Sequence, residues 1–218
     1  MPTATQLLCL PGASGNSQFW KPLADHLVHP GERHFVRYPG FGDMPADSSI
    51  NSLEDLCQQI AAHIDKPTAI LAQSMGGILA VRLAVQFPTL ITHLILSVTS
   101  GGIDMRRFDA VDWRAEFGAA NPHLPDWFVC DNSNLQPDLA ALKQPTLLLW
   151  GDADPISPVA VGKYLHQQIA HADLHVVAGG QHDLVLVHAA SLASLVDRHL
   201  ARYEPVQPHD LSSAVPHS

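Results

Sequence analysis

A serine at position 74 stands where a nucleophile would be expected. Residues 68–72 form a short apolar run and residues 75–87 carry apolar side chains at helical spacing, so Ser74 falls in the turn between a predicted strand and a predicted helix. Ala72 and Gly76 are small, which lets strand and helix approach closely there. Such a turn exposes the hydroxyl beside a helix N-terminus, which favours an oxyanion. We predict nucleophilic attack on a carbonyl; the plainer alternative is a serine that only caps the helix.

A serine hydroxyl needs a base to remove its proton and a third group to orient that base. Both groups follow Ser74 in the chain, the acid first and the histidine second. The segment WGDADPISP (150–158) comes after one apolar run and holds Asp152 and Asp154. The segment GGQHD (179–183) comes after the next and holds His182. Ser74, an aspartate of the first segment and His182 therefore form a candidate triad.

These loops, in this order, resemble those of the α/β-hydrolase fold family. The family's acid usually lies in a Gly-x-x-Asp-x-x-x-Pro loop, which matches Gly151, Asp154 and Pro158 here and implies Asp154 as the acid in place of Asp152. The family's histidine follows a glycine by one or two residues before the C-terminal helix, which implies His182. The resemblance covers about residues 5–202.

The segment LPGASG (10–15) resembles the family's His-Gly-x loop, whose third-position amide joins the amide after the serine in an oxyanion hole. The resemblance implies the backbone N–H groups of Ala13 and Met75 as donors. Pro11 replaces the usual histidine, a departure that affects the support of the loop more than its donor. The antiparallel hairpin that often precedes the first parallel strand is missing, and the lid is shorter than in many relatives. We expect a minimal version of the fold.

The elements that would position these loops follow from hydrophobic periodicity. Residues 6–10, 34–38, 68–72, 93–98, 146–150 and 174–177 are expected to be strands, and residues 18–29, 52–64, 75–87, 158–170 and 184–202 helices. This alternation predicts an α/β fold, with an about six-stranded, mainly parallel sheet and helices on both faces. Ser157 and Pro158 are predicted to be the N-cap and first residue of one helix.

One connection is unusually long. Residues 100–144 separate two predicted strands and are interpreted as a lid within a single domain spanning residues 1–202. Its four aromatic residues either line a hydrophobic acyl pocket or form the lid's own core. Residues 203–218, rich in Pro, Ser and His, are expected to be a flexible tail. The four aromatic residues are Trp113, Phe117, Trp127 and Phe128.

Composition excludes several other classes of protein. With 46% hydrophobic residues, a formal charge of −9 and no basic run, the chain has the composition of a globular protein without a nucleic-acid partner. Three scattered cysteines indicate reduced thiols, and the 14 histidines include no HExxH motif, so no metal is expected. The N-terminus MPTATQLLCLPG lacks a basic leader and a long apolar run, so we expect a cytoplasmic protein without a membrane partner.

Four other residues are weaker candidates for the triad. Ser100 also precedes a glycine by two positions, but Val98 is bulky where a small residue is needed. Asp104 is a possible alternative acid, since some members of the fold place the acid after that strand. His175 falls inside a predicted strand and His188 inside a predicted helix, so both are expected to be structural.

The predicted function is hydrolysis of a small carboxylic ester or thioester through an acyl-enzyme on Ser74, without metal or organic cofactor. The expected partner is a small-molecule acyl substrate, and nothing in the sequence indicates an oligomeric state. A short apolar lid and the lack of a charged pocket signature favour a carboxylesterase. Cleavage of C–C bonds, lyase chemistry and non-catalytic binding of a small ligand remain alternatives, because one fold supports many functions.

Overall fold

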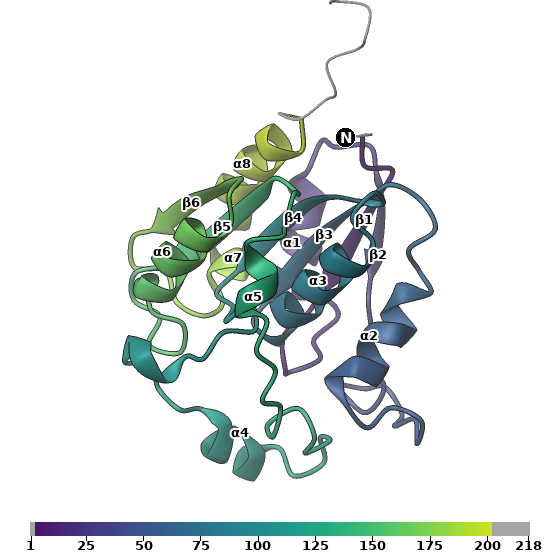
Figure 1. Ribbon diagram of the computed structural model, residues 1–218, viewed down its shortest axis with the longest axis vertical. Coiled ribbons are helices and arrows are strands. Elements are labelled where there is room, and N and C mark those ends of the chain that lie inside the picture. The colour runs from purple at the N-terminus through teal and green to yellow at the C-terminus, as the bar shows by residue number, and fades with distance from the viewer. Residues whose placement is uncertain (1–2, 202–218) are drawn as a thin grey trace, which may run out of the picture.

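The computed structural model describes residues 3–201, and within them the strands form one parallel sheet of six in the order β2-β1-β3-β4-β5-β6 (Figure 1). All five neighbouring pairs are parallel. This confirms the predicted α/β fold with a mainly parallel sheet. The strands are β1 (Gln6–Leu10), β2 (Glu32–Phe35), β3 (Thr68–Gln73), β4 (Ile91–Ser97), β5 (Thr146–Gly151) and β6 (Ala172–Val177).

The strands β1, β3, β4 and β5 are buried along their whole length, because helices cover both faces of the sheet. The edge strand β2 lies earlier in the chain than predicted, at Glu32–Phe35, where it pairs with β1. Val36 and Tyr38, whose apolar side chains suggested a strand, come after it and are buried in the core. The apolar side chains of Val36 and Tyr38 thus belong to the start of the loop that follows β2.

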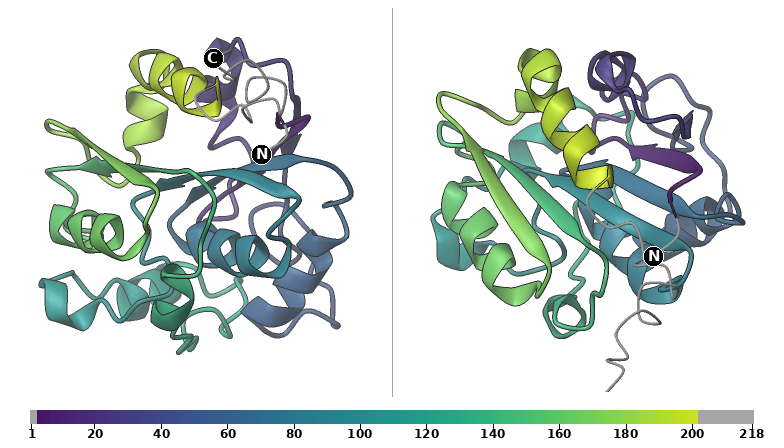
Figure 2. Two further views of the ribbon diagram at one scale, coloured as in Figure 1. Left: turned by 45° about the horizontal axis from the view of Figure 1, so that its top comes forward. Right: turned by 90° about the horizontal axis from the view of Figure 1, so that it is seen from above.

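Helices pack on both faces of the sheet, as predicted. Figure 2 shows α1, α7 and α8 on one face and α2, α3 and α6 on the other. The amphipathic helix α2 begins after Ser52, whose hydroxyl accepts the Asp55 amide. These helices are α1 (Lys21–His26), α2 (Leu53–Ala61), α3 (Met75–Gln86), α6 (Val159–Gln168), α7 (Leu184–Val187) and α8 (Ala189–Ala201).

Several helices are shorter than predicted: residues 18–29 contain only α1 and residues 52–64 only α2. Two further predictions on helices were wrong. The C-terminal helix is interrupted at His188, which lies in a turn between α7 and α8. The helix α6 begins at Val159, because Pro158 is extended, with ψ 153°, and acts as the N-cap. Ser157 makes no cap; its side chain is buried instead. The predicted flexible tail at residues 203–218 lies outside the described residues.

The connection 100–144 crosses the carboxyl ends of the strands (Figure 1). It contains the 3-10 turn η1 (Arg106–Phe108) and the short helices α4 (Arg114–Ala120) and α5 (Gln136–Leu139). No residue of α4 is buried, so this helix rests on the molecule without entering its core. Between residues 3 and 201 there is no helix with the length and apolar character needed to cross a membrane.

Candidate active site

Ser74 occupies a strained turn between β3 and α3. Its φ of 53° and ψ of −120° lie outside the regions that non-glycine residues favour, which costs about 1–3 kcal/mol. The Ser74 amide donates to the Ser97 carbonyl at 3.0 Å, and the Ser74 carbonyl accepts from Thr99 Oγ1 at 2.6 Å. The end of β4 therefore holds the turn in its unusual conformation.

Small residues allow three segments to meet around Ser74. A Cβ added to Gly76 would lie 2.6 Å from the Pro11 carbonyl oxygen, so the first loop packs directly on the start of α3. A Cβ on Gly12 would collide with the Gln73 side chain. The residue two positions after Ser74 must therefore be small, because the backbone of the loop that carries Ala13 lies directly against it.

His182 and Asp154 form a hydrogen-bonded pair. The distance between His182 Nδ1 and Asp154 Oδ2 is 2.8 Å, and the other Asp154 oxygen accepts the Ile156 amide at 2.8 Å. Asp154 is only 4% exposed, whereas the His182 side chain is 25% exposed. Since an ionised carboxylate only accepts, Nδ1 carries the proton and Nε2 keeps a lone pair that can take up another.

The neighbouring Asp152 has a different task. Its Oδ1 accepts the Gly179 amide at 2.6 Å, and the Ala153 amide donates to the Gly180 carbonyl at 3.0 Å. Gly151 lies so close to Gly180 that a Cβ there would collide with the backbone. These contacts join the loop of Asp154 to the loop of His182. Asp152 therefore supports the loops from outside, whereas Asp154 contacts His182 directly.

Two cavities, of about 180 and about 150 Å³, share Ser74 and His182 in their walls. Met75 lines the first cavity and Ala13 the second, so the two predicted oxyanion donors flank Ser74. Met75 is the first residue of α3, and its N–H is one of those without a partner inside the helix. Ser74, His182, Met75 and Ala13 thus line these two cavities, and Asp154 adjoins them through its contact with His182.

The aromatic residues of the connection 100–144 differ in their positions. Trp113 lines both cavities, Phe117 the second and Phe128 the first. Phe128 is also buried and stacks with Trp113, while Trp127 packs edge-on against Phe128 and Phe41. These aromatic residues therefore both line the cavities and pack against one another as a local core.

The weaker candidates lie elsewhere or have other partners. Ser100 lines the first cavity, where its hydroxyl accepts the Gly102 amide. Asp104 is bound to Arg106, which lowers the pKa of its carboxyl to about 2. His175 is exposed on β6, and His188 lies between α7 and α8.

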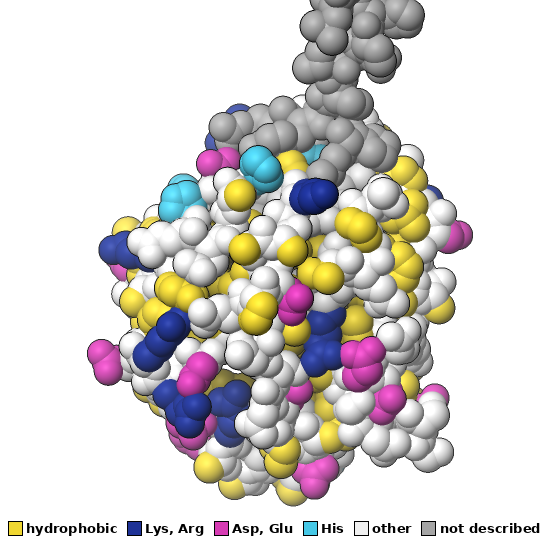
Figure 3. Space-filling view, viewed as in Figure 1, with side chains coloured by type: hydrophobic (Ala, Val, Ile, Leu, Met, Phe, Trp, Pro, Cys, Tyr) yellow, Lys and Arg dark blue, Asp and Glu magenta, His cyan; other side chains and the backbone are white. Residues whose placement is uncertain are grey.

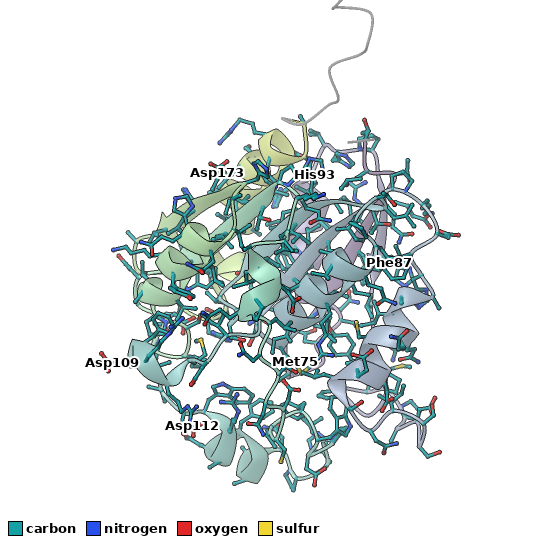
Figure 4. The ribbon with its side chains drawn as sticks, viewed as in Figure 1. Met75, Phe87, His93, Asp109, Asp112 and Asp173 are labelled. Carbon is teal, nitrogen blue, oxygen red and sulfur yellow. The ribbon has the colours of Figure 1, made fainter. Side chains whose placement is uncertain are left out.

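Charged side chains of both signs gather at the lower left of Figure 3, where Figure 4 labels Asp109 and Asp112. The ion pairs of Arg106 with Asp104 and of Arg114 with Asp112 belong to this stretch of the connection. Both pairs are exposed, so they stabilise the fold little. Arg106, Arg114 and Asp112 also line the first cavity, so charges of both signs lie in its wall.

Sequence reasoning missed two residues that contact the site. Gln73 donates from Nε2 to the His182 carbonyl at 3.3 Å and lines the second cavity. Thr99 binds the Ser74 carbonyl. Gln73 occupies a position that the serine motif leaves open, so the sequence carried no signal for it. Thr99 lies next to Ser100 after a strand, and this location alone could have pointed to it.

Within residues 3–201 no group of three or more His, Cys, Asp or Glu side chains is arranged to hold a metal ion. The family model described as "Alpha/beta hydrolase family" matches residues 7–129, more than half of the chain. A second model, described as "TAP-like protein", matches residues 125–209. The chain therefore belongs to the alpha/beta hydrolase family.

Several named proteins are similar to this chain. A pimeloyl-[acyl-carrier protein] methyl ester esterase of Neisseria meningitidis is 26% identical, covering 89% of this chain and 93% of that protein. Thioesterase TesA of Mycobacterium marinum is 34% identical over 39% of this chain and 36% of its own length. The solved type II thioesterase BorB, from the borrelidin biosynthetic cluster, is 26% identical with a TM-score of 0.72, covering 92% of this chain and 93% of that one.

An esterase from Exiguobacterium antarcticum has a TM-score of 0.73 with this chain at 16% identity, covering 92% of this chain and 93% of that one. At this identity the likeness concerns the fold alone. It shows that this fold recurs in a protein of very different sequence.

Proposed function

We propose that this protein hydrolyses carboxylic esters or thioesters through an acyl-enzyme on Ser74. The observation that carries the proposal is the 2.8 Å contact between His182 Nδ1 and Asp154. His182 and Ser74 line the same two cavities. A neutral histidine held in this tautomer beside a serine hydroxyl is the arrangement that nucleophilic acyl transfer needs. Membership of the alpha/beta hydrolase family and the named relatives support the same reaction class.

In the proposed mechanism, His182 Nε2 removes the Ser74 proton as the oxygen attacks the substrate carbonyl. Asp154 stabilises the imidazolium that forms. The backbone N–H groups of Ala13 and Met75 bind the tetrahedral oxyanion. His182 then protonates the leaving alcohol or thiol, and water attacks the acyl-enzyme with His182 again as base. The step returns the proton to Ser74 and releases a carboxylic acid.

The cavities favour a short acyl group. Their volumes of about 180 and about 150 Å³ are below the roughly 300–1,000 Å³ that drug-sized ligands occupy. We propose that the connection 100–144 acts as a lid, with Trp113, Phe117 and Phe128 as the apolar wall and Trp127 as their support. The domain would then comprise residues 1–202, with the lid as its insertion.

Both an ester and a thioester fit this chemistry, and the relatives include both kinds of enzyme. The relatives in Neisseria are named for a methyl ester of a carrier-bound acyl chain, and TesA and BorB are named as thioesterases. We propose the ester as the first candidate and the thioester as the second. Turnover of a p-nitrophenyl ester compared with a thioester of the same acyl chain separates the two.

The first test is labelling by a fluorophosphonate, which reacts with an activated serine. Wild-type protein should be labelled and Ser74→Ala should not, while both fold normally. Ser100→Ala is the matched control, because Ser100 lines the same cavity and loses the same hydroxyl group. Labelling that persists in Ser74→Ala, or that disappears in Ser100→Ala alone, would overturn the assignment of Ser74.

A further inference from the structure

Two strained residues lie beside each other at the carboxyl ends of neighbouring strands. Ser74 has a φ of 53° and Val98 a φ of 42°, although valine is β-branched and disfavours this region. The parallel register pairs Gln73 with Ser97, the last residues of β3 and β4, so Ser74 and Val98 are the first residues after these two strands. Strain of this kind persists only where surrounding contacts enforce it.

The residues on either side of Val98 supply those contacts. The Ser97 carbonyl accepts the Ser74 amide at 3.0 Å, and Thr99 Oγ1 donates to the Ser74 carbonyl at 2.6 Å. Val98 itself is 1% exposed, and its amide donates to Leu149 on β5. The turn at Val98 thus brings the Thr99 hydroxyl back to the peptide group of Ser74.

The direction of the Thr99 hydroxyl is determined by its other partner. Thr99 Oγ1 accepts the Gly101 amide at 3.0 Å, so its single proton goes to the Ser74 carbonyl. Thr99 is 1% exposed and packs against Gly77, where an added Cβ would collide with the Thr99 side chain. The side chain therefore has no room to turn away.

The Ser74 carbonyl and the Met75 N–H belong to one planar trans peptide, so they point in opposite directions. The carbonyl accepts two donors, the Gly77 amide at 3.0 Å and the Thr99 hydroxyl at 2.6 Å. Donors that hold the carbonyl on one side aim the N–H toward the other. We propose that Thr99 is a positioning residue, which orients the Ser74–Met75 peptide so that the Met75 N–H meets the oxyanion. The inference rests on the proposed function and deepens it, because Met75 is a proposed oxyanion donor.

The decisive variant is Thr99→Val, which keeps the shape and removes the hydroxyl. Thr146→Val is the matched control: its hydroxyl is also buried and also donates to a carbonyl, that of Gln144 at 3.0 Å, away from Ser74. Thr99→Val should lower kcat for a p-nitrophenyl ester by about 10-fold or more and leave KM unchanged, because a misdirected donor weakens the transition state alone. Thr146→Val should leave both constants unchanged.

A second readout is the affinity for phenylboronic acid, which forms a tetrahedral adduct on an active serine. Thr99→Val should weaken this affinity by the same factor as kcat, an effect that a purely structural role would not produce. Thr99→Ala and Thr99→Ser differ by the hydroxyl alone, so this pair gives the comparison even if Thr99→Val does not fold. Thr99→Ser should retain kcat and Thr99→Ala should lose it.

Two results would contradict the inference in distinguishable ways. If Thr99→Val, or Thr99→Ala in its place, keeps the kcat and the boronate affinity of the wild type, Thr99 does not position the oxyanion donor. If the wild type itself is not labelled by a fluorophosphonate, the proposed function fails and the inference falls with it.

Discussion

The two ends of the sheet each hold a histidine in a different environment. His182, at the carboxyl end, pairs with Asp154 and reaches a cavity. His93, near the amino end of β4, is 1% exposed and lies edge-on to His199, with 5.5 Å between ring centroids. Figure 4 shows His93 near the top of the molecule and Met75 well below it. The environment, more than the residue type, decides which histidine can do chemistry.

The electrostatics of the amino end explain this difference. Burial, together with the smaller effects of the neighbouring His199 and His29, lowers the pKa of His93 to about 4. A histidine with this pKa stays neutral at pH 7 and has little affinity for a proton. At the carboxyl end a buried carboxylate adjoins His182, and the loops of all parallel strands converge there. We therefore expect acid–base chemistry at that end.

The strongest test of this comparison exchanges each histidine for glutamine. His182→Gln should lower kcat/KM for a p-nitrophenyl ester by about 10⁴-fold or more, since the base is lost. His93→Gln should leave kcat/KM unchanged and shift only the midpoint of urea unfolding. A large loss of activity in a folded His93→Gln variant would contradict the division between the two ends.

A test within the carboxyl end compares its two aspartates. Asp154→Asn should lower kcat by roughly 10³–10⁴-fold, because the amide no longer fixes the His182 tautomer or stabilises its charged form. Asp152→Asn makes the same chemical change two residues away, and its side-chain oxygen can still accept the Gly179 amide. Its kcat should match that of the wild type. Equal losses of kcat in both variants would show that the activity depends on the structure of the loop and not on the Asp154 carboxylate.

The smallest effect concerns stability against pH at the amino end. The folded pKa of His93, about 4, is below the ordinary 6.5, so the unfolded chain binds the proton more readily. Stability is therefore full above pH 6.5 and falls as the pH drops toward 4, by on the order of 3 kcal/mol. The lowered pKa of His29 acts in the same direction. Urea unfolding from pH 7 to 4 measures this loss.

His93→Gln supplies the control for that measurement, because glutamine does not titrate. Its unfolding free energy should vary less between pH 6.5 and 4 than that of the wild type. The Asp104 carboxyl, whose pKa is lowered from 3.8 to about 2 in the folded protein, loses its stabilising effect mainly below pH 4, under this window. An identical pH dependence in the two proteins would assign the loss to other groups.

Much of the fold could be predicted from local patterns. The strand β1 lies at the predicted residues, and β3 and β5 differ from prediction by one residue at one end. The edge strand β2 was misplaced, because its position depends on pairing with β1 and not on an apolar run of its own. The break at His188 and the start of α6 after Pro158 also depend on packing and backbone geometry, which periodicity does not report.

The sequence by itself determined the type and order of the chemical groups, because a serine between strand and helix and two later loops can be read from spacing alone. Only the tertiary structure decided how they meet. In the folded protein Asp154 contacts His182, Asp152 accepts the Gly179 amide, and the Thr99 hydroxyl donates to the Ser74 carbonyl. These contacts join residues far apart in the chain, and they depend on strand register and on close backbone approach, which exist only once the sheet has formed.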